Sequence, residues 1–209
     1  MKIETLNGQY EYEPTHLFYG KKLINKVQAK ENLMLFKKVL DKSGITFGLI
    51  YGTLLGAVRE KDFINHDEDV DVFILDENRE NLLKLLFLFR EYGFEVARYK
   101  NDLLSLIRED DYIDIYIFNK ALFGRKCNGD FLPKRFFLEF DELEFFDSCF
   151  KTVHQPIKFL EFAYGKTWSV PQKNRPAEVK STLTNIRITI IKFLPKRIFL
   201  LLKKILGKK

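Results

Sequence analysis

Three aspartates stand at alternate positions in this chain, Asp67, Asp69 and Asp71, and they lead directly into the apolar stretch 72–75. Residues two apart in a β-strand share a face, so the segment predicts a strand with carboxylates crowded on one face. Neighbouring like charges repel each other, and removing them from water costs further free energy. A bound divalent cation is the simplest compensation, because oxygen-rich sites suit Mg²⁺ and Mn²⁺.

Two other interpretations of this triplet compete with a metal site. The strand could lie at the edge of a sheet, with its aspartates facing water. The triplet could also begin a Ca²⁺ loop of the D-x-D-x-D-G type, whose sixth position needs glycine for a sharp turn. Val72 occupies that position here, which argues against a calcium loop and leaves the other two interpretations open.

A fourth carboxylate, Asp114, falls in the middle of another predicted strand, 112–118. Isoleucines alternate along one face of that strand, and Asp114 lies among aromatic residues on the other. An unpaired charge is costly in such a place. A solvated face or a single salt bridge is the ordinary explanation, but beside the triplet Asp114 becomes a candidate third wall of the same acidic site.

Periodicity and Gly or Pro punctuation predict the elements that must position these residues. We expect helices at 21–43, 54–58, 77–92 and 156–164, and strands at 46–51, 69–75, 94–99, 103–108 and 112–118. Gly52 and Thr53 would form the turn between the first strand and the second helix, and Asp76 would cap the third helix. Residues 119–155 are expected to be irregular.

Composition limits the class of protein. The chain has 209 residues, of which 46% are hydrophobic and 31% charged, which predicts one sizeable globular domain, with or without an appendage. Cys127 and Cys149 stand outside any C-x-x-C pattern, which argues against zinc and a disulfide framework. The first residues lack the apolar core of a signal peptide, and no run of about 20 uncharged apolar residues predicts a membrane span. We therefore expect a cytoplasmic protein.

The positive charge is concentrated at the C-terminal end. Residues 185–209 contain eight Lys and Arg and no acid, and taking these from the net +6 leaves −2 for the rest. This distribution does not support a nucleic-acid footprint spread over the main domain. The apolar residues between the cations predict an amphipathic element, kinked at Pro195, that lies on an anionic membrane surface. A helix that packs in an oligomer and a disordered basic tail are the alternatives.

A strand, a Gly52 turn, a helix and an acidic strand in this order are typical of the nucleotidyltransferase fold, an α+β architecture with a mixed sheet flanked by helices. Gly52 would allow the backbone to approach a phosphate closely, and the helix N-terminus would offer N–H groups to an anion. Arg59 could pair with a phosphate oxygen, or it could simply be an exposed residue at a helix end.

The resemblance becomes specific in three segments: 51–59 (YGTLLGAVR), 63–64 (FI) and 67–72 (DEDVDV). Together they resemble the signature of the LicD family, which includes bacterial phosphocholine transferases and is related to fukutin and fukutin-related ribitol-phosphate transferases. Asp114 in YIDIY is similar to the family's later carboxylate-bearing strand. The likeness extends over roughly residues 25–176 and includes the segment 159–168.

The resemblance implies transfer of phosphocholine or a related substituted phosphate from a CDP-linked donor to a sugar hydroxyl. The acceptor would be a cell-surface glycan, for example a lipid-linked glycan made in lipopolysaccharide biosynthesis. Asp69 and Asp71 would be the best ligands of Mg²⁺ or Mn²⁺, with Asp67 as a third. Asp114 would be a metal ligand or the base, and Gly52 and Thr53 would contact donor phosphate.

The chain departs from the family's usual pattern at Asp62, Asn65, His66 and Glu68, so its donor and acceptor preference could differ. Beside the acidic run, His66 is either a phosphate contact or a solvated loop histidine. Aromatic residues could either stack a cytosine ring or belong to the core; they are Tyr164, Trp168, Phe136 and Phe137.

The predicted organisation is an N-terminal extension (1–20), a catalytic domain (21–176) and a linker with the basic tail (177–209). This places the protein on the inner face of the cell membrane, bound peripherally through the tail. Two other functions stay open: a nucleotidyltransferase that attaches a nucleotide from an NTP to a small molecule or protein, and a non-catalytic membrane-associated module.

Overall fold

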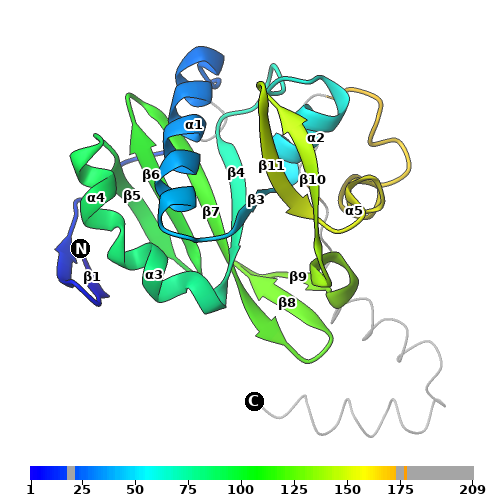
Figure 1. The fold of residues 1–209 in the computed structure, drawn as a ribbon. Coiled ribbons are helices and arrows are strands. Elements are labelled where there is room, and N and C mark those ends of the chain that lie inside the picture. The colour runs from blue at the N-terminus through cyan, green and yellow to red at the C-terminus, as the bar shows by residue number, and fades with distance from the viewer. Residues whose placement is uncertain (18–21, 173–176, 178–209) are drawn as a thin grey trace, which may run out of the picture. The chain divides into compact units, whose positions relative to one another are not determined.

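The computed structural model describes residues 1–17, 22–172 and 177 (Figure 1). Its helices are α1 (Lys26–Lys42), α2 (Tyr51–Arg59), α3 (Arg79–Lys84), α4 (Leu86–Glu91) and α5 (Pro156–Tyr164), with 3₁₀ turns η1 (Asp76–Asn78) and η2 (Lys134–Phe137). Its strands are β1 (Lys2–Thr5), β2 (Gly8–Glu11), β3 (Phe47–Leu49), β4 (Val70–Leu75), β5 (Glu95–Lys100), β6 (Leu103–Arg108), β7 (Asp111–Ala121), β8 (Gly124–Cys127), β9 (Asp130–Pro133), β10 (Phe140–Phe145) and β11 (Ser148–Val153).

One mixed sheet organises the described part of the chain. Its strand order is β10-β11-β3-β4-β7-β6-β5, and β8 pairs with β7 and then with β9. The β11–β3 and β4–β7 pairs are parallel, and the other pairs are antiparallel. Figure 1 shows α1, α3 and α4 in front of the sheet, while α2 packs against β4 and α5 against β11. This arrangement confirms the predicted α+β class with helices flanking a mixed sheet.

Helix α1 begins later than its apolar pattern predicts. The Asn25 side chain accepts hydrogen bonds from the backbone N–H groups of Val27 and Gln28, so the helix is capped at residue 25 rather than 21. Leu23 and Val27, apolar residues within the predicted helix, are exposed. The face that enters the core is supplied by later residues: Leu33, Phe36 and Leu40, each fully buried.

The predicted turn at Gly52 and Thr53 is instead the first turn of helix α2. Strand β3 ends at Leu49, and Tyr51, expected at the end of the strand, already belongs to the helix. Tyr51 makes the sharp change of direction with a φ of 45°, a conformation that costs free energy for a residue with a side chain. Burial of its ring holds it there.

The helix predicted at 77–92 is divided at Leu85 into α3 and α4. Asp76 does not cap it. The Asp76 carboxylate accepts hydrogen bonds from the backbone of Lys120 and the side chain of Arg125 instead. The Asp76 carboxylate, which the local pattern predicted as a helix cap, therefore makes tertiary contacts instead.

The expectation that residues 119–155 are irregular was wrong. Strand β7 continues to Ala121, and four further strands follow, of which β10 and β11 form a hairpin. Strand β11 then joins the main sheet next to β3 through the pair Thr152 and Leu49. The β8–β9 turn is Asn128-Gly129, with positive φ at both residues, and this Asn-Gly pair is a hairpin signal that the expectation of irregular structure overlooked. The β10–β11 turn at Phe146 and Asp147 has positive φ without Gly or Pro, so punctuation did not reveal that hairpin.

The predicted basic tail, 185–209, lies outside the described residues. Among the helices that the structure does describe, none combines the length and the apolar character that crossing a membrane requires.

Candidate active site

A row of polar residues crosses four neighbouring strands of the sheet. Arg98 on β5 is paired with Ser105 on β6, Ser105 with Asp114 on β7, and Asp114 with Asp71 on β4. Side chains at paired positions share a face of the sheet. The register therefore brings Asp71 and Asp114 together, as the sequence predicted, from segments more than 40 residues apart.

Asp71 is fixed by the start of helix α2. One carboxylate oxygen, Oδ2, accepts a hydrogen bond of 2.9 Å from the backbone N–H of Gly52. The backbone N–H of Asp71 donates to Thr53 Oγ1 at 2.8 Å. The helix N-terminus thus stabilises an aspartate of the chain itself, so this N–H group of Gly52 is already used and is not the free phosphate donor that we expected.

Asp67 and Asp69 precede strand β4, which begins at Val70. The predicted strand face with three carboxylates is therefore wrong in detail, because only Asp71 lies within the strand. The loop nevertheless directs Asp67 towards the same place. A Cβ atom on Gly52 would lie 2.6 Å from Asp67 Oδ2 and 3.1 Å from Asp71 Oδ2, so both oxygens converge over Gly52.

The carboxylates of this cluster hold protons more tightly than ordinary carboxylates. Burial raises the pKa of Asp67 to about 6. Burial and the neighbouring carboxylates raise the pKa of Asp69 and of Asp71 well above the usual value. Loss of hydration is the main cause and repulsion between carboxylates adds to it, so positive charge at the cluster would stabilise the ionised forms.

Asp114 is the one member of the cluster with a basic partner in the row. Arg98 Nη2 donates to both carboxylate oxygens, at 2.8 and 3.1 Å, and the Ser105 hydroxyl donates to Oδ1. Burial raises the pKa of Asp114, and the Arg98 guanidinium acts in the opposite direction. Asp114 is thus held in a buried ion pair with Arg98, next to Asp71 on the neighbouring strand.

Asp67, Asp69 and Asp71 line a cavity of about 540 Å³. Its volume lies within the range of about 300–1,000 Å³ that is typical of small-molecule sites. Acidic and aromatic side chains dominate its wall, and the lining residues that matter here are Tyr51, Gly52, Arg59, His66, Asp67, Glu68, Asp69, Asp71, Tyr112, Tyr116, Asp130, Tyr164 and Trp168.

The predicted site residues divide into two groups around this cavity. Asp67, Asp69, Asp71, Gly52 and Arg59 line it. The Arg59 guanidinium donates to Glu60 and to the Trp168 carbonyl oxygen. The second group, Thr53 and Asp114, lies behind the wall: both are buried and neither lines the cavity.

The candidate aromatic residues divide in the same way. Tyr164 and Trp168 line the cavity, and so does His66. The Phe136 ring packs edge-on against Phe159, and Phe137 packs against Phe73 and Phe118. This pair therefore belongs to the hydrophobic core, which was the alternative interpretation of these residues.

Two residues near the site were missed by the sequence analysis. Asp130 on β9 lines the cavity and accepts a hydrogen bond of 2.8 Å from the Tyr51 hydroxyl. The Asn128-Gly129 turn before it predicts a hairpin, but no local pattern predicts that Asp130 faces the cavity. Arg98 could have been found, since an arginine within a predicted strand next to the strand of Asp114 is a natural partner for that charge.

The metal ion expected from the sequence stays a prediction. Among the residues that the structure describes, no group of three or more His, Cys, Asp or Glu side chains is arranged so that it could hold an ion. Two observations favour a cation at this place. Asp67 Oδ2 is buried without a hydrogen-bond partner, and the donors around Gly52 are carboxylates, which suit Mg²⁺ and Mn²⁺.

Comparison with known proteins finds relatives that match part of this chain. Human fukutin, named a ribitol-5-phosphate transferase, is 30% identical over 164 residues, which cover 69% of this chain and 34% of fukutin. An uncharacterized protein of Rickettsia typhi is 31% identical over 101 residues, 46% of this chain and 32% of that protein. The chain therefore spans about a third of the length of these relatives.

A weaker likeness exists to a solved structure. The solution structure of the antibiotic-resistance factor ANT(2'')-Ia is 12% identical, with a TM-score of 0.48 over 86% of this chain and 94% of that chain. A likeness at that level adds nothing to the assignment. The model of the family described as LicD/FKTN/FKRP, nucleotidyltransferase domain, matches residues 44–172, which hold α2, β4, β7 and the whole acidic cluster. The chain belongs to this family.

Proposed function

We propose that this protein transfers phosphocholine or a related substituted phosphate from a CDP-linked donor to a sugar hydroxyl of a cell-surface glycan. The observation that carries the proposal is the convergence of Asp67 and Asp71 over Gly52, with Asp69 beside them, at the wall of a cavity of about 540 Å³. The family supports the class of reaction, and the name of fukutin supports a substituted phosphate as the transferred group.

Asp67, Asp69 and Asp71 would hold one or two Mg²⁺ or Mn²⁺ ions. A cation at this place supplies charge neutralisation for a diphosphate and stabilises the leaving phosphate. The carboxylates would fix the position of the cation. The Gly52 N–H group anchors Asp71, and Asp67 Oδ2 lies over the same glycine. Burial, together with repulsion from neighbouring carboxylates, raises the pKa values of these groups, and a cation would favour their charged forms.

Arg59 would contact the phosphates of the donor, and Gly52 would hold the carboxylates close to them. The absence of a side chain at Gly52 leaves room above the first turn of α2, where a Cβ atom would meet two carboxylates. The Arg59 guanidinium lines the cavity and is oriented by Glu60, so it could pair with a phosphate oxygen. Thr53 would act through Asp71, because its hydroxyl accepts the N–H of Asp71.

The reaction makes one bond and breaks one. The acceptor hydroxyl oxygen attacks the phosphorus that carries the substituent, and the bond from that phosphorus to the CMP oxygen breaks. The hydroxyl proton passes to a carboxylate that faces the cavity. We assign Asp114 to support of Asp71 rather than to this proton, since it is paired with Arg98 and Ser105 and does not line the cavity.

The nucleobase of the donor would lie against the aromatic wall. Tyr164 and Trp168 line the cavity on the side of Arg59, whose Nη1 donates to the Trp168 carbonyl oxygen. Stacking of a base on such rings is worth about 1–3 kcal/mol. Residues 185–209 would hold the protein on the anionic inner face of the cell membrane, near a lipid-linked acceptor.

A donor screen tests the proposal and separates it from the alternative. The purified protein is incubated with Mg²⁺ and either CDP-choline, CDP-ribitol, CDP-glycerol or each NTP, with a sugar acceptor present. We expect CMP release from one CDP-linked donor, detected by mass. Pyrophosphate release from an NTP, with no CMP from any CDP-linked donor, would instead establish a nucleotidyltransferase.

Charge-matched variants connect this activity to the site. Asp69→Ala with Asp71→Ala should abolish turnover and leave the fold intact, because the change removes repulsion. Glu13→Ala with Glu91→Ala removes the same charge from two exposed positions and should leave turnover unchanged. A double variant at 69 and 71 that retains full cellular function would favour a non-catalytic module.

A further inference from the structure

The turn between β7 and β8 presents two large apolar side chains to solvent. Ala121 and Gly124 form the last pair of the ladder, so Leu122 and Phe123 alone make the turn, and they are 85% and 73% exposed. Two-residue hairpin turns usually carry Gly, Asn or Asp, which tolerate a positive φ. Neither residue has a positive φ here, and neither gains packing from its position.

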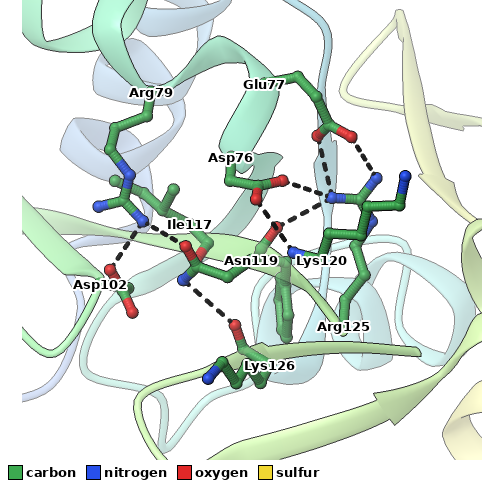
Figure 2. A network of polar contacts seen from close by, with 10 residues as sticks. Asp76, Glu77, Arg79, Asp102, Ile117, Asn119, Lys120, Arg125 and Lys126 are labelled. Carbon is green, nitrogen blue, oxygen red and sulfur yellow. Dashed lines mark hydrogen bonds and ion pairs between the residues drawn. The ribbon is translucent and has the colours of Figure 1, made fainter. Parts of the chain in front are cut away.

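The turn is held rigidly in place. Arg125 on β8 donates to Asp76 at 2.6 Å and to both carboxylate oxygens of Glu77 at 2.7 and 2.9 Å (Figure 2). The backbone N–H of Lys134 donates to the Phe123 carbonyl oxygen at 3.0 Å. The exposed pair is therefore a fixed projection from the fold.

Lysines surround this projection. Lys120, Lys126 and Lys134 are exposed, and among the residues that the structure describes none of the three forms an ion pair. Strand spacing puts them within roughly 10 Å of the turn. Asp76 and Glu77, the acids of the network, are occupied by Arg125, so the surface around the turn is positive.

We propose that the Leu122–Phe123 turn inserts into the surface of a bilayer that contains anionic lipid, with Lys120, Lys126 and Lys134 at the headgroups. Two apolar side chains on a narrow hairpin are too small a surface for a stable protein interface, whereas a shallow apolar wedge with flanking cations suits a lipid surface. Each lysine near an anionic surface strengthens partition about fivefold. The inference is independent of the chemistry proposed for the cavity.

A tryptophan placed at the turn tests insertion directly in the full-length chain. Trp168, the single tryptophan of the chain, is replaced in Trp168→Phe, and Phe123→Trp is added. Vesicles of phosphatidylcholine and phosphatidylglycerol with brominated acyl chains should quench the new tryptophan. Leu6→Trp in the same background is the matched control, because Leu6 is an exposed apolar residue in the β1–β2 turn, and we expect no quenching there.

This experiment distinguishes lipid binding by the turn from lipid binding by any other segment. Sedimentation of the chain with vesicles, without quenching at position 123, would overturn the proposal, since another segment would then carry the binding. Failure to sediment with anionic vesicles would overturn it as well.

Loss of the apolar pair tests its contribution to affinity. Leu122→Ser with Phe123→Ser should weaken binding to anionic vesicles by at least about tenfold, whereas Leu6→Ser should leave it unchanged. Circular dichroism checks that the fold is retained. Unchanged vesicle affinity of the double variant would overturn the proposal. Self-association of the parent without lipid, abolished in the double variant, would also overturn it, because the turn would then bind a second copy of the chain.

Discussion

Gly52 lies where carboxylates from two segments come closest to the first turn of α2. Its N–H group donates to Asp71, and its missing side chain leaves room for Asp67 Oδ2. In a helix interior glycine is less favourable than alanine by about 1 kcal/mol. Helix stability therefore does not explain a glycine at this position. The close approach of the two carboxylates explains it, because a side chain would occupy their place.

The variant Gly52→Ala should separate stability from the site. A Cβ atom would lie 2.6 Å from Asp67 Oδ2, so the Asp67 carboxylate must move. We expect a loss of turnover of roughly 100-fold, because a 1 Å displacement at a reacting centre has that effect. Urea unfolding should show stability within about 1 kcal/mol of the parent.

Asp67→Ala provides the control for this interpretation. If Gly52→Ala acts by displacing Asp67, the two changes should be strongly non-additive in turnover. Additive effects would mean that alanine at position 52 disturbs something other than Asp67.

Arg98 is the counter-charge of a carboxylate that is almost completely buried. Arg98→Met should destabilise the protein by about 3–5 kcal/mol, because it leaves Asp114 buried without a partner. Lys2→Met breaks the exposed Lys2–Glu11 pair and should cost less than about 1 kcal/mol. Chemical denaturation of both variants gives the comparison.

The partner change Asp114→Asn completes the Arg98 test. Added to Arg98→Met, it removes the stranded charge and should restore part of the lost stability. No recovery in the double variant would show that Arg98 contributes by packing and not by pairing with Asp114.

At the scale of elements, the β8–β9 hairpin connects the wall of the cavity to the 3₁₀ turn η1. Asp130 on β9 bonds to Tyr51 at the start of α2, while Arg125 on β8 holds the hairpin to η1 (Figure 2). The same figure shows Arg79 joining Asp102 and Asn119 close by. The position of Asp130 therefore depends on ion pairs outside the site.

The Arg125 network predicts a pH dependence of stability. The hydrogen bond from Arg125 lowers the pKa of Glu77 to about 2. Since the folded pKa is below the unfolded value of about 4.5, this contribution is present above pH 4.5 and is lost as the pH falls towards 2. The Glu77 side chain is half-exposed, so solvent screening keeps the contribution small.

Arg125→Met should abolish this behaviour. The stability difference between parent and variant should shrink between pH 4.5 and pH 2, and the carboxyl resonance of Glu77 should titrate near 4.5 in the variant. A Glu77 titration that is unchanged by Arg125→Met would remove Arg125 as the cause of the low pKa.

At the scale of the whole molecule, the acidic cluster exists only in the folded state. The loop before β4, strand β7 and helix α2 each contribute a part, and these segments are separate in the unfolded chain. A cation that binds this cluster must therefore stabilise the entire fold. This gives a readout of the site that does not depend on substrates.

Magnesium should raise the melting temperature of the parent protein. At 100 times its dissociation constant an ion adds about 2.7 kcal/mol, which corresponds to a shift of about 5–10 °C for a chain of this size. Asp69→Asn with Asp71→Asn should show no shift, and without magnesium it should melt above the parent, because the repulsion is reduced. Sodium chloride at equal ionic strength controls for screening, and an equal shift with sodium would exclude a specific site.

The described residues also show which features local chemistry decides. Alternation predicted β5, β6 and β7 to within a few residues, Pro156 and Gly165 bounded α5, and Gly44 and Gly93 ended α1 and α4. Side-chain spacing and turn chemistry act over a few residues, so the sequence expresses them directly. The signature around Gly52 and Asp71 likewise predicted the family and the aspartate cluster.

Tertiary structure alone decided how these parts meet. The pairing of Thr152 with Leu49 closes a loop of about 100 residues, and the row from Arg98 to Asp71 depends on the register of four strands. The Asp76 carboxylate pairs with Arg125 instead of capping a helix. Asp130 lines the cavity and bonds to Tyr51, although the Asn128-Gly129 turn before it predicts only a hairpin and not a site. Strand order and register follow from burial and pairing between distant segments, which a local pattern of residue types does not encode.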